Sequence, residues 1–411
     1  MHQRNITQHV RTALSDTPVI LLNGARQTGK STLAKGIVAK LGGDYVTLDD
    51  ATVLAAATAD PTGFLRGLGD ITVIDEVQKA PGLFPAIKQQ VDSDRRPGRY
   101  LLTGSANVLL LPKISESLAG RMEIITLWPL SQGELRERTE RFIDHLFAAE
   151  LPRMMRAAPQ DHDVISLLAS GGYPEAVART DEARRHDWFT SYLSAILHRD
   201  VRDLANIEGL TDMPRLLALL AARSSGLLNT SELSRSSTIA QTTLKRYLTL
   251  LQMTFLMEPL SAWSSNLGKR LIKAPKVHLI DTGLATHLTG HSPQRLTHDT
   301  SLLGNLLETF VVMELRKQLT WSNVRARIFH FRTLAGKEVD VVLEDARGRL
   351  VGIEVKSAAS VTKKDFSGLE ILAEETGKKF VRGVVLYTGD TAVAFGDKLI
   401  ALPISALWRM T

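Results

Sequence analysis

A short glycine-bracketed segment, GARQTGKST at residues 24–32, constrains this chain more than any other feature. Gly24 and Gly29 enclose four residues and are followed by Lys30 and Ser31, which fits the pattern G-x-x-x-x-G-K-[ST] at every fixed position. Such a loop needs a strand before it and a helix after it, so that backbone N–H groups and the positive end of the helix meet phosphate oxygens. The apolar run PVILLN precedes the segment, and STLAKGIVAKLG continues from it with helical spacing. The segment therefore predicts a phosphate-binding loop.

ATP with Mg²⁺ is the ligand that this loop predicts. The ammonium of Lys30 is expected to reach the β- and γ-phosphate oxygens, and the hydroxyl of Ser31 to hold Mg²⁺. A chance glycine-rich turn is the alternative, and the flanking strand and helix argue against it. The predicted nucleotide-binding residues are Gly24, Ala25, Arg26, Gln27, Thr28, Gly29, Lys30, Ser31 and Thr32.

A second acidic strand is needed to turn a phosphate loop into an ATPase. ITVIDEVQ, residues 71–78, is an apolar run that ends in Asp75 and Glu76. We expect Asp75 to hold Mg²⁺ through water and Glu76 to polarise the attacking water, which makes Glu76, with Lys30, a predicted catalytic residue. This pair of segments predicts ATP hydrolysis.

A third apolar strand, RYLLTGSAN at residues 99–107, ends in the polar residues Thr103 and Ser105. Its composition suits a strand inserted between the two previous ones, with polar side chains at its tip facing the γ-phosphate or the water. A plain turn is the alternative. We expect Thr103 and Ser105 to sense the nucleotide.

Composition sets the outer limits. At about 150 residues per domain, 411 residues predict two to four domains, and 44% apolar residues suffice for packed cores. The formal charge of +6 favours a polyanionic partner weakly. The absence of cysteine excludes disulfides and thiolate zinc sites. The N-terminus lacks a signal-peptide core, and no uncharged stretch reaches membrane-spanning length, so we expect a soluble, cytoplasmic protein without membrane contact.

Residues 227–260 read as helix, turn, helix and strand, which is typical of a winged helix. The apolar stripe of the second helix leaves Lys245 and Arg246 facing outward. A basic loop joins this strand to the next, and such a loop suits phosphate. A winged helix used only for protein contacts is the alternative. The DNA-binding candidates are Lys245, Arg246, Lys269, Arg270 and Lys273.

Two strands near the C-terminus carry a D…E-x-K arrangement. EVDVVLED contains Asp340, and RLVGIEVKS contains Glu354 and Lys356 on one face of its strand. Two carboxylates would hold Mg²⁺ while the lysine orients or deprotonates a hydrolytic water, and Glu308 of the preceding amphipathic helix completes the set. A surface ion pair is the alternative. Downstream, Lys363 and Lys364 are placed to brace a phosphate backbone or simply to be solvated.

The order of these segments, with SESLAGR and LWPLSQGE after the third strand, resembles one group of bacterial and archaeal AAA+ ATPases along nearly the whole chain. This resemblance implies that Arg121 is an arginine finger acting on a neighbouring subunit, with a surface ion pair as the alternative. It also implies a helical lid that contains SGGYPEAV and Arg199. The C-terminal region resembles the PD-(D/E)xK nuclease superfamily, although Val339 stands where a proline often precedes the aspartate.

Together these features predict an α/β multidomain chain. The expected parts are an AAA+ parallel αβα core at 1–145, a helical lid at 146–220, a winged-helix domain at 221–298 and a restriction-endonuclease-like α/β domain at 299–411. The expected function is ATP-driven binding and remodelling of branched or forked DNA by a homo-oligomeric ring, with a hexamer favoured and cleavage of DNA left open. The alternative is a nucleotide-gated signalling switch whose C-terminal domains bind proteins.

Overall fold

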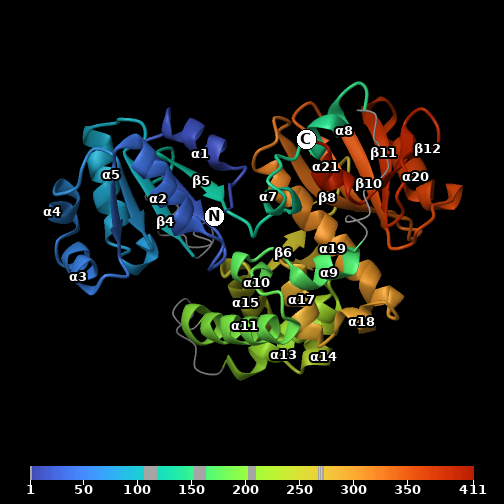
Figure 1. Ribbon diagram of the computed structural model, residues 1–411, viewed down its shortest axis with the longest axis horizontal. Helices are drawn as coiled ribbons and strands as arrows, with labels where there is room; N and C mark the ends of the chain where they lie inside the picture. The colour runs from blue at the N-terminus through green and yellow to red at the C-terminus, as the bar shows by residue number, and fades with distance from the viewer. Residues whose placement is uncertain are drawn as a thin grey trace. The chain divides into compact units, whose positions relative to one another are not determined.

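The structure is a computed structural model that describes residues 2–105, 118–151, 163–201, 210–266, 268, 270 and 273–411, without the side chains of 199, 200 and 210. The chain forms two compact units (Figure 1). The first unit comprises Met1–Leu130 and Leu250–Leu256, and the second comprises Ser131–Thr249 and Met257–Thr411. The predicted boundaries at 145, 220 and 298 fall inside the second unit and stay a prediction.

A parallel sheet forms the centre of the first unit. Its strands are β1 (Val19–Asn23), β2 (Asp44–Thr47), β3 (Thr72–Asp75), β4 (Tyr100–Gly104) and β5 (Met122–Thr126), in the order β2-β3-β4-β1-β5. All neighbouring pairs are parallel. Strands β1, β3 and β4 are buried along their whole length, as expected for a sheet covered on both faces. Strand β4 lies between β1 and β3, as its sequence predicts.

Helices connect and cover these strands (Figure 1). They are α1 (Thr7–Leu14), α2 (Lys30–Leu41), α3 (Ala51–Ala59), α4 (Pro61–Arg66) and α5 (Leu83–Ser93), with a short 3₁₀ turn η1 (Val77–Lys79) after β3. In α5, the buried Leu83, Ile87 and Val91 recur at helical spacing and join the core formed with β1, β3 and β4. The predicted parallel α/β class of the N-terminal part is confirmed.

The second unit begins with a helical region. Its elements are α7 (Gln132–Leu135), α8 (Phe142–Phe147), α9 (Val164–Ser170), α10 (Pro174–Val177), α11 (Glu182–Ala195), η4 (Ile196–Val201), η5 (Leu210–Asp212) and α13 (Met213–Ala222). Aspartates at the N-caps of α9 and α11 accept backbone N–H groups. The described part of 146–220 is thus helical, and its role as a nucleotide lid stays a prediction.

Two helices and a strand pair follow. They are α14 (Thr230–Ser237), α15 (Gln241–Met253), β6 (Met257–Leu260) and β7 (Lys276–Leu279), and the two strands pair antiparallel. In α15, Leu244, Tyr247 and Leu248 are buried whereas Lys245 and Arg246 are exposed, as the stripe predicts. This succession of elements is the one expected for a winged helix. The winged-helix fold itself stays a prediction.

A mixed sheet completes the second unit. Helices α17 (Thr282–Thr289), α18 (Pro293–Leu296) and α19 (Thr300–Leu319) lead to β8 (Ala326–Arg332), β9 (Glu338–Asp345) and β10 (Leu350–Lys356); η6 (Lys363–Phe366) and α20 (Ser367–Thr376) lead to β11 (Phe380–Tyr387), β12 (Val393–Ala394), β13 (Leu399–Pro403) and α21 (Ala406–Arg409). The sheet order is β12-β13-β11-β10-β9-β8. Strands β8, β9 and β10 pair antiparallel, and β11 is parallel to both β10 and β13.

Close packing of α20 on this sheet requires glycine beneath it. A Cβ added at Gly352 in β10 would lie 2.5 Å from a methyl carbon of Leu369, and one at Gly383 in β11 would lie 3.1 Å from the Leu369 Cβ. The α20 residues Leu369 and Leu372 are fully buried in this core. The packing holds β9 and β10, which carry the predicted acidic residues, in fixed register.

Among the described residues, none of the helices combines the length and the apolar character needed to cross a lipid bilayer.

Candidate functional site

The phosphate loop lies between β1 and α2, where its sequence predicts it. Gly24 has φ +143°, and a Cβ there would lie 2.2 Å from the Leu127 carbonyl oxygen, so only glycine fits without movement of the backbone. Gly29 has φ +93° and forms the N-cap of α2. The loop therefore presents the N-terminal end of α2, which is the geometry that phosphate requires.

The Lys30 side chain folds back into this loop. Its Nζ donates to the carbonyl oxygens of Gly24, at 3.0 Å, and of Ala25, at 2.8 Å, and the side chain is buried. The Thr28 hydroxyl donates to the same Ala25 oxygen at 2.9 Å. A buried ammonium at the mouth of a glycine-rich loop is placed to bind anionic oxygens, so these residues fit a bound nucleotide phosphate.

Asp75 gathers three hydroxyl groups at the end of β3. The Ser31 Oγ donates to Oδ1 at 2.9 Å, the Tyr45 hydroxyl donates to Oδ2 at 2.5 Å, and the Thr103 hydroxyl donates to Oδ1. Asp75 is only 4% exposed. Burial and the hydrogen bond to Asp75 raise the pKa of Tyr45 above its usual range. A carboxylate beside a loop hydroxyl is the oxygen donor set that Mg²⁺ with nucleotide phosphates takes, so the site fits that ion.

Glu76 occupies a strained position next to Asp75. Its φ of +59° lies in the left-handed region, which a glutamate adopts rarely. Its N–H donates to the Thr103 hydroxyl at 3.1 Å, and its carboxylate accepts from the Gln78 amide, which also donates to the Ser105 hydroxyl at 3.1 Å. The predicted base and both predicted sensor residues thus belong to one hydrogen-bonded group.

Three residues of this site escape prediction from the sequence. Gln78 has a local signal, since it lies two positions after Glu76 on the same short turn. Tyr45 reaches Asp75 from β2. Arg4, which precedes α1, donates to the carbonyl oxygens of Thr28 and Trp128, both at 2.7 Å, and so fixes the position of the phosphate loop. The contacts of Tyr45 and Arg4 join residues that are far apart in the sequence, so the sequence does not indicate them.

Arg121, the predicted arginine finger, is paired within its own unit. Its guanidinium donates to both carboxylate oxygens of Asp92 and to the Ala119 carbonyl oxygen, at 3.0 Å. The hydrogen bond from Arg121 lowers the pKa of Asp92. To act on a neighbouring subunit, Arg121 must leave Asp92, and the finger stays a prediction.

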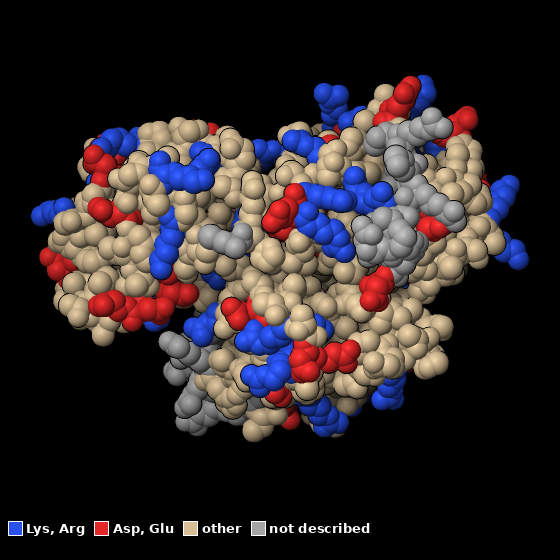
Figure 2. Space-filling view, in the orientation of Figure 1, with Lys and Arg blue, Asp and Glu red and all other residues tan. Residues whose placement is uncertain are grey.

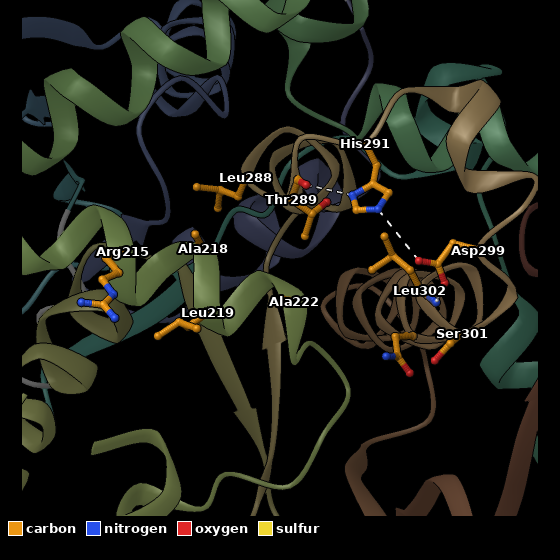
Figure 3. A pocket seen from close by; sticks show the side chains of 11 residues that line it. Arg215, Ala218, Leu219, Ala222, Leu288, Thr289, His291, Asp299, Ser301 and Leu302 are labelled. Atoms are coloured by element: carbon orange, nitrogen blue, oxygen red, sulfur yellow. Dashed lines mark hydrogen bonds and ion pairs between the residues drawn. The ribbon is translucent and has the colours of Figure 1, made fainter. Parts of the chain in front are cut away.

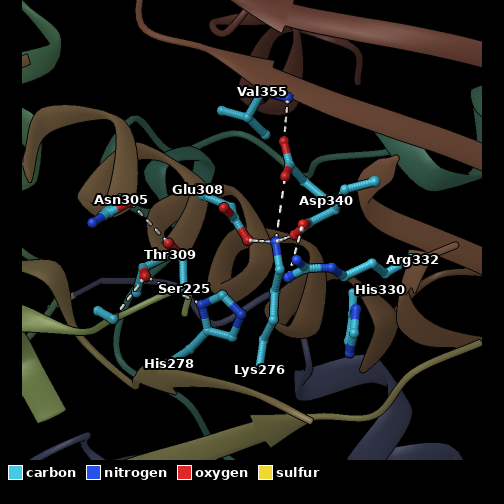
Figure 4. Close-up of polar contacts among 12 residues, drawn as sticks. Ser225, Lys276, His278, Asn305, Glu308, Thr309, His330, Arg332, Asp340 and Val355 are labelled. Carbon is cyan, nitrogen blue, oxygen red and sulfur yellow. Dashed lines mark hydrogen bonds and ion pairs between the residues drawn. The ribbon is translucent and has the colours of Figure 1, made fainter. Parts of the chain in front are cut away.

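In the second unit, β9 and β10 bring the D…E-x-K residues onto adjacent strands. Lys356 Nζ donates to Glu354 Oε1 at 2.8 Å, and Asp340 Oδ2 accepts the Val355 N–H at 2.9 Å. The sequence does not predict the next contact: Lys276 Nζ lies 2.7 Å from Glu308 Oε1 and 3.4 Å from Asp340 Oδ1 (Figure 4). A lysine ammonium therefore stands among the carboxylates predicted to hold a metal ion.

The described residues contain no group of three or more histidine, aspartate or glutamate side chains placed to hold a metal ion. Glu308, Glu338, Asp340 and Glu354 form an acidic cluster around Lys276, and burial raises the pKa of Glu354 to about 8. Burial also acts to lower the pKa of Lys276, but the carboxylates of Glu308, Asp340 and Glu338 outweigh it and raise that pKa. The donor set at this site does not fit Mg²⁺, because its central position is taken by a charged lysine.

Arg270, predicted to contact DNA, has close partners within the second unit. Its guanidinium donates to both oxygens of Glu344, at 2.7 and 2.9 Å, and lies over the rings of Trp263 and Phe329, 5.2 and 5.1 Å from their centroids. Its side chain is 10% exposed. A nearby carboxylate and two aromatic rings thus hold the guanidinium within the second unit, and its contact with DNA stays a prediction.

The other DNA-binding candidates lie as follows. Lys245 and Arg246 are on the exposed face of α15, and Lys273 donates to the Arg332 carbonyl oxygen at 3.2 Å. Lys269 and the side chain of Arg199 lie outside the described residues. Lys363 and Lys364 are exposed on η6. Figure 2 shows basic and acidic side chains intermixed on the face drawn, so net charge alone does not mark a binding surface there.

A separate hollow of about 530 Å³ lies among α13, α17 and α19 (Figure 3). Its lining is mostly apolar, with Arg215 at one side and His291 3.9 Å from Asp299 at the other. The residues of the acidic cluster are not part of this lining. The hollow is therefore distinct from the sites that the sequence predicts.

The family comparisons agree with the geometry of the first unit. Residues 16–136 match the family described as an AAA domain, a range that includes the phosphate loop, Asp75, Glu76 and Thr103. Residues 161–295 and 303–407 match two domains of unknown function, DUF8612 and DUF4143. The fold and the match together define this protein as an ATPase of the AAA, P-loop type.

Two mycobacterial proteins resemble the chain almost throughout. They are uncharacterised proteins of Mycobacterium bovis (strain ATCC BAA-935 / AF2122/97) and Mycobacterium tuberculosis (strain ATCC 25618 / H37Rv), each 31% identical over 405 residues, which is 98% of this chain and 84% of theirs. The chain belongs to the same protein family as these two proteins.

Solved structures resemble the chain more loosely. A Walker-type ATPase of Pyrococcus abyssi is 14% identical, over 70% of this chain and 96% of its own, with a TM-score of 0.42. The Holliday junction branch migration motor RuvB of Thermotoga maritima is 19% identical, over 62% and 88%, with a TM-score of 0.29. DnaA from Aquifex aeolicus is 13% identical, over 60% and 85%, with a TM-score of 0.29. TM-scores of this size do not support an inference about function. The proposal for function is therefore based on the site residues.

Proposed function

We propose that this protein is a Mg²⁺-dependent ATP hydrolase that binds DNA and uses the energy of hydrolysis to remodel branched or forked DNA. One observation carries the ATPase part: Ser31, Asp75 and Thr103 meet in a single hydrogen-bonded group at the carboxyl ends of β3 and β4, beside the phosphate loop. Ligands of open α/β sheets bind at this edge.

The residues divide the chemistry between them. The loop N–H groups and Lys30 hold the phosphates, while Ser31 and Asp75 hold Mg²⁺, which would neutralise charge on the β- and γ-phosphate oxygens. Glu76 takes the proton of the attacking water. Thr103, through its bonds to Asp75 and to the Glu76 N–H, keeps both acids in register with the loop. The Gln78 amide donates to the Glu76 carboxylate. When the nucleotide binds, the attacking water would replace Gln78 as the partner of that carboxylate.

The DNA part of the proposal is supported by α15 and by the net charge. Lys245 and Arg246 are exposed on the second helix of a helix-turn-helix arrangement that an antiparallel strand pair follows. The proposed division is an ATPase core at 1–145, a lid at 146–220, a winged helix at 221–298 and a nuclease-like domain at 299–411. A homo-oligomeric ring in the cytoplasm belongs to the same proposal, with Arg121 acting between subunits.

The test is the ATPase rate with and without four-way-junction, forked, duplex and single-stranded DNA, with strand release measured in the same samples. We expect stimulation by one DNA form and strand release that requires ATP. The Lys30→Ala variant is the control, since it keeps α15 but should lose the nucleotide. An unchanged rate with no DNA binding at low salt would refute the DNA part and favour a nucleotide-gated switch that binds proteins.

A further inference from the structure

We infer that Lys276 takes the place of a metal ion in the C-terminal acidic cluster, so that the nuclease-like domain holds its carboxylates together without a divalent cation and does not cut DNA. This inference narrows the role of that domain within the proposed function: it would bind DNA or proteins and leave strands intact. It does not depend on ATP hydrolysis or on DNA remodelling.

The contacts of Lys276 carry the inference. Its Nζ forms ion pairs with Glu308, at 2.7 Å, with Asp340, at 3.4 Å, and with Glu338, and the side chain is 3% exposed. Figure 4 shows this ammonium at the centre of the group, between the Glu308 carboxylate from α19 and the Asp340 carboxylate from β9. A buried ammonium with three carboxylate partners occupies the position in which a nuclease would hold its cation.

The other oxygens of the predicted metal ligands are engaged in part, and Glu354 Oε2 is buried without a hydrogen-bond partner. Asp340 uses its second oxygen for the Val355 N–H, and Glu354 uses one oxygen for Lys356. A magnesium ion needs oxygens at about 2.1 Å in an octahedral arrangement. A metal ion at the centre would have to expel Lys276, and an unpaired ammonium at that depth is strongly unfavourable. Because Lys276 is part of the chain, its ammonium always competes with a metal ion for these carboxylates.

The surrounding basic groups leave Lys276 as the central cation. His278 and His330 are buried beside it, and burial together with the Lys276 charge lowers the pKa of His330 to about 4 and that of His278 well below its usual range. Arg332 lies 3.7 Å from Glu338, at the edge of the cluster. Both histidines are neutral at pH 7, so Lys276 is the cation that contacts Glu308 and Asp340, and Arg332 adds a second positive charge beside Glu338.

The same contacts give the cluster a structural role. Lys276 is the first residue of β7, in the strand pair of the predicted winged helix, whereas Glu308 belongs to α19 and Asp340 to β9. The ion pairs therefore fasten that strand pair to the helix and the sheet of the nuclease-like domain. A metal-filled site would fasten only the elements that supply its carboxylates.

The experiment measures Mn²⁺ binding, by electron paramagnetic resonance and by calorimetry, in full-length protein that carries Lys30→Ala and no nucleotide. We expect no Mn²⁺ site that depends on Asp340. In the added variant Lys276→Met, the freed carboxylates should gain one Mn²⁺ per chain, and a further Asp340→Asn substitution should remove it. The control Lys317→Met removes another buried lysine, which pairs with Glu314 at 2.6 Å, and should gain none.

Two results would overturn the inference. One is Mn²⁺ binding with Lys276 intact that disappears on Asp340→Asn, a measurement that requires no change at Lys276. The other is a folded Lys276→Met protein, judged by circular dichroism, that binds no Mn²⁺. Failure of the proposed function is recognised separately, because it leaves these Mn²⁺ titrations as expected and changes only the ATPase and strand-release assays.

Discussion

At the residue scale, the nucleotide site is defined by short-range spacing and completed by distant partners. The pattern that contains Lys30 and Ser31 and the pair Asp75 and Glu76 can all be found in the sequence. Their protein partners include Tyr45, which is 30 residues from Asp75. A hydroxyl that donates to a buried carboxylate leaves no periodic signal, so this contact could not be predicted.

We predict that Glu76→Gln leaves ATP bound but lowers turnover by about 10²–10⁴-fold, because the amide cannot accept the proton of the attacking water. Binding of a fluorescent ATP analogue and release of phosphate measure the two effects. Lys30→Ala is the matched comparison and should lose binding itself. Turnover that persists in Glu76→Gln would show that another group is the base.

At the element scale, one face of α15 packs while the opposite face carries the proposed DNA contacts. Sequence periodicity predicts this division, because buried side chains recur every three to four residues along a helix. It does not predict the outcome for Arg270. That residue lies between β6 and β7 at a helical position, and its partner Glu344 is 74 residues further along the chain. A partner so distant in the sequence leaves no local pattern that would indicate the contact.

We predict that Lys245→Glu with Arg246→Glu weakens DNA binding at low salt and lowers the slope of log K against log salt by about 2, since two phosphate contacts are lost. Fluorescence anisotropy with labelled DNA measures both. Lys378→Glu with Lys379→Glu makes the same charge change at exposed positions after α20 and should have the smaller effect. Equal loss in both pairs would indicate a response to net charge alone.

The turn that begins α7 gives a prediction about pH. Glu140 Oε1 accepts the Gly133 N–H at 2.7 Å, and burial, together with the charge of Glu314, raises the pKa of Glu140 to about 7. A carboxyl whose pKa is higher in the folded state stabilises the fold most when protonated. The free energy of unfolding should therefore decrease as pH rises from about 4.5 to about 7.

Urea unfolding at a series of pH values, followed by intrinsic fluorescence, tests this expectation. Glu140→Gln keeps an oxygen that can accept the Gly133 N–H and cannot ionise, so it should flatten the decrease. An identical pH dependence in this variant would mean that other groups titrate over that range.

At the scale of the whole molecule, the chain combines an AAA ATPase unit with a second unit whose sheet carries the acidic cluster. The α/β class of the first unit can be predicted because apolar strands alternate with helices, and the polar end of β4 predicts its place between β1 and β3. The environment of the acidic cluster cannot. Lys276 is 64 residues from Asp340 and belongs to a different predicted domain.

We predict that Arg121→Ala still assembles but hydrolyses ATP slowly, by about 10²-fold or more, because a guanidinium that stabilises the transferred phosphoryl group is lost between subunits. Native mass spectrometry measures assembly, and phosphate release measures turnover. Arg95→Ala is the control, because it removes an exposed arginine that donates to the carbonyl oxygen of Gly120, the neighbour of Arg121. Normal turnover of assembled Arg121→Ala would leave Arg121 with only its ion pair to Asp92.

The sequence by itself determined the phosphate loop, the acidic strand end and the outward face of α15, since each depends on residues a few positions apart and on local periodicity. Only the tertiary structure decided that Arg270 pairs with Glu344 and that an ammonium lies among the predicted metal ligands. The physical reason is that a buried charge is neutralised by whichever opposite charge the fold brings within about 3 Å, and that neighbour is set by packing rather than by sequence distance.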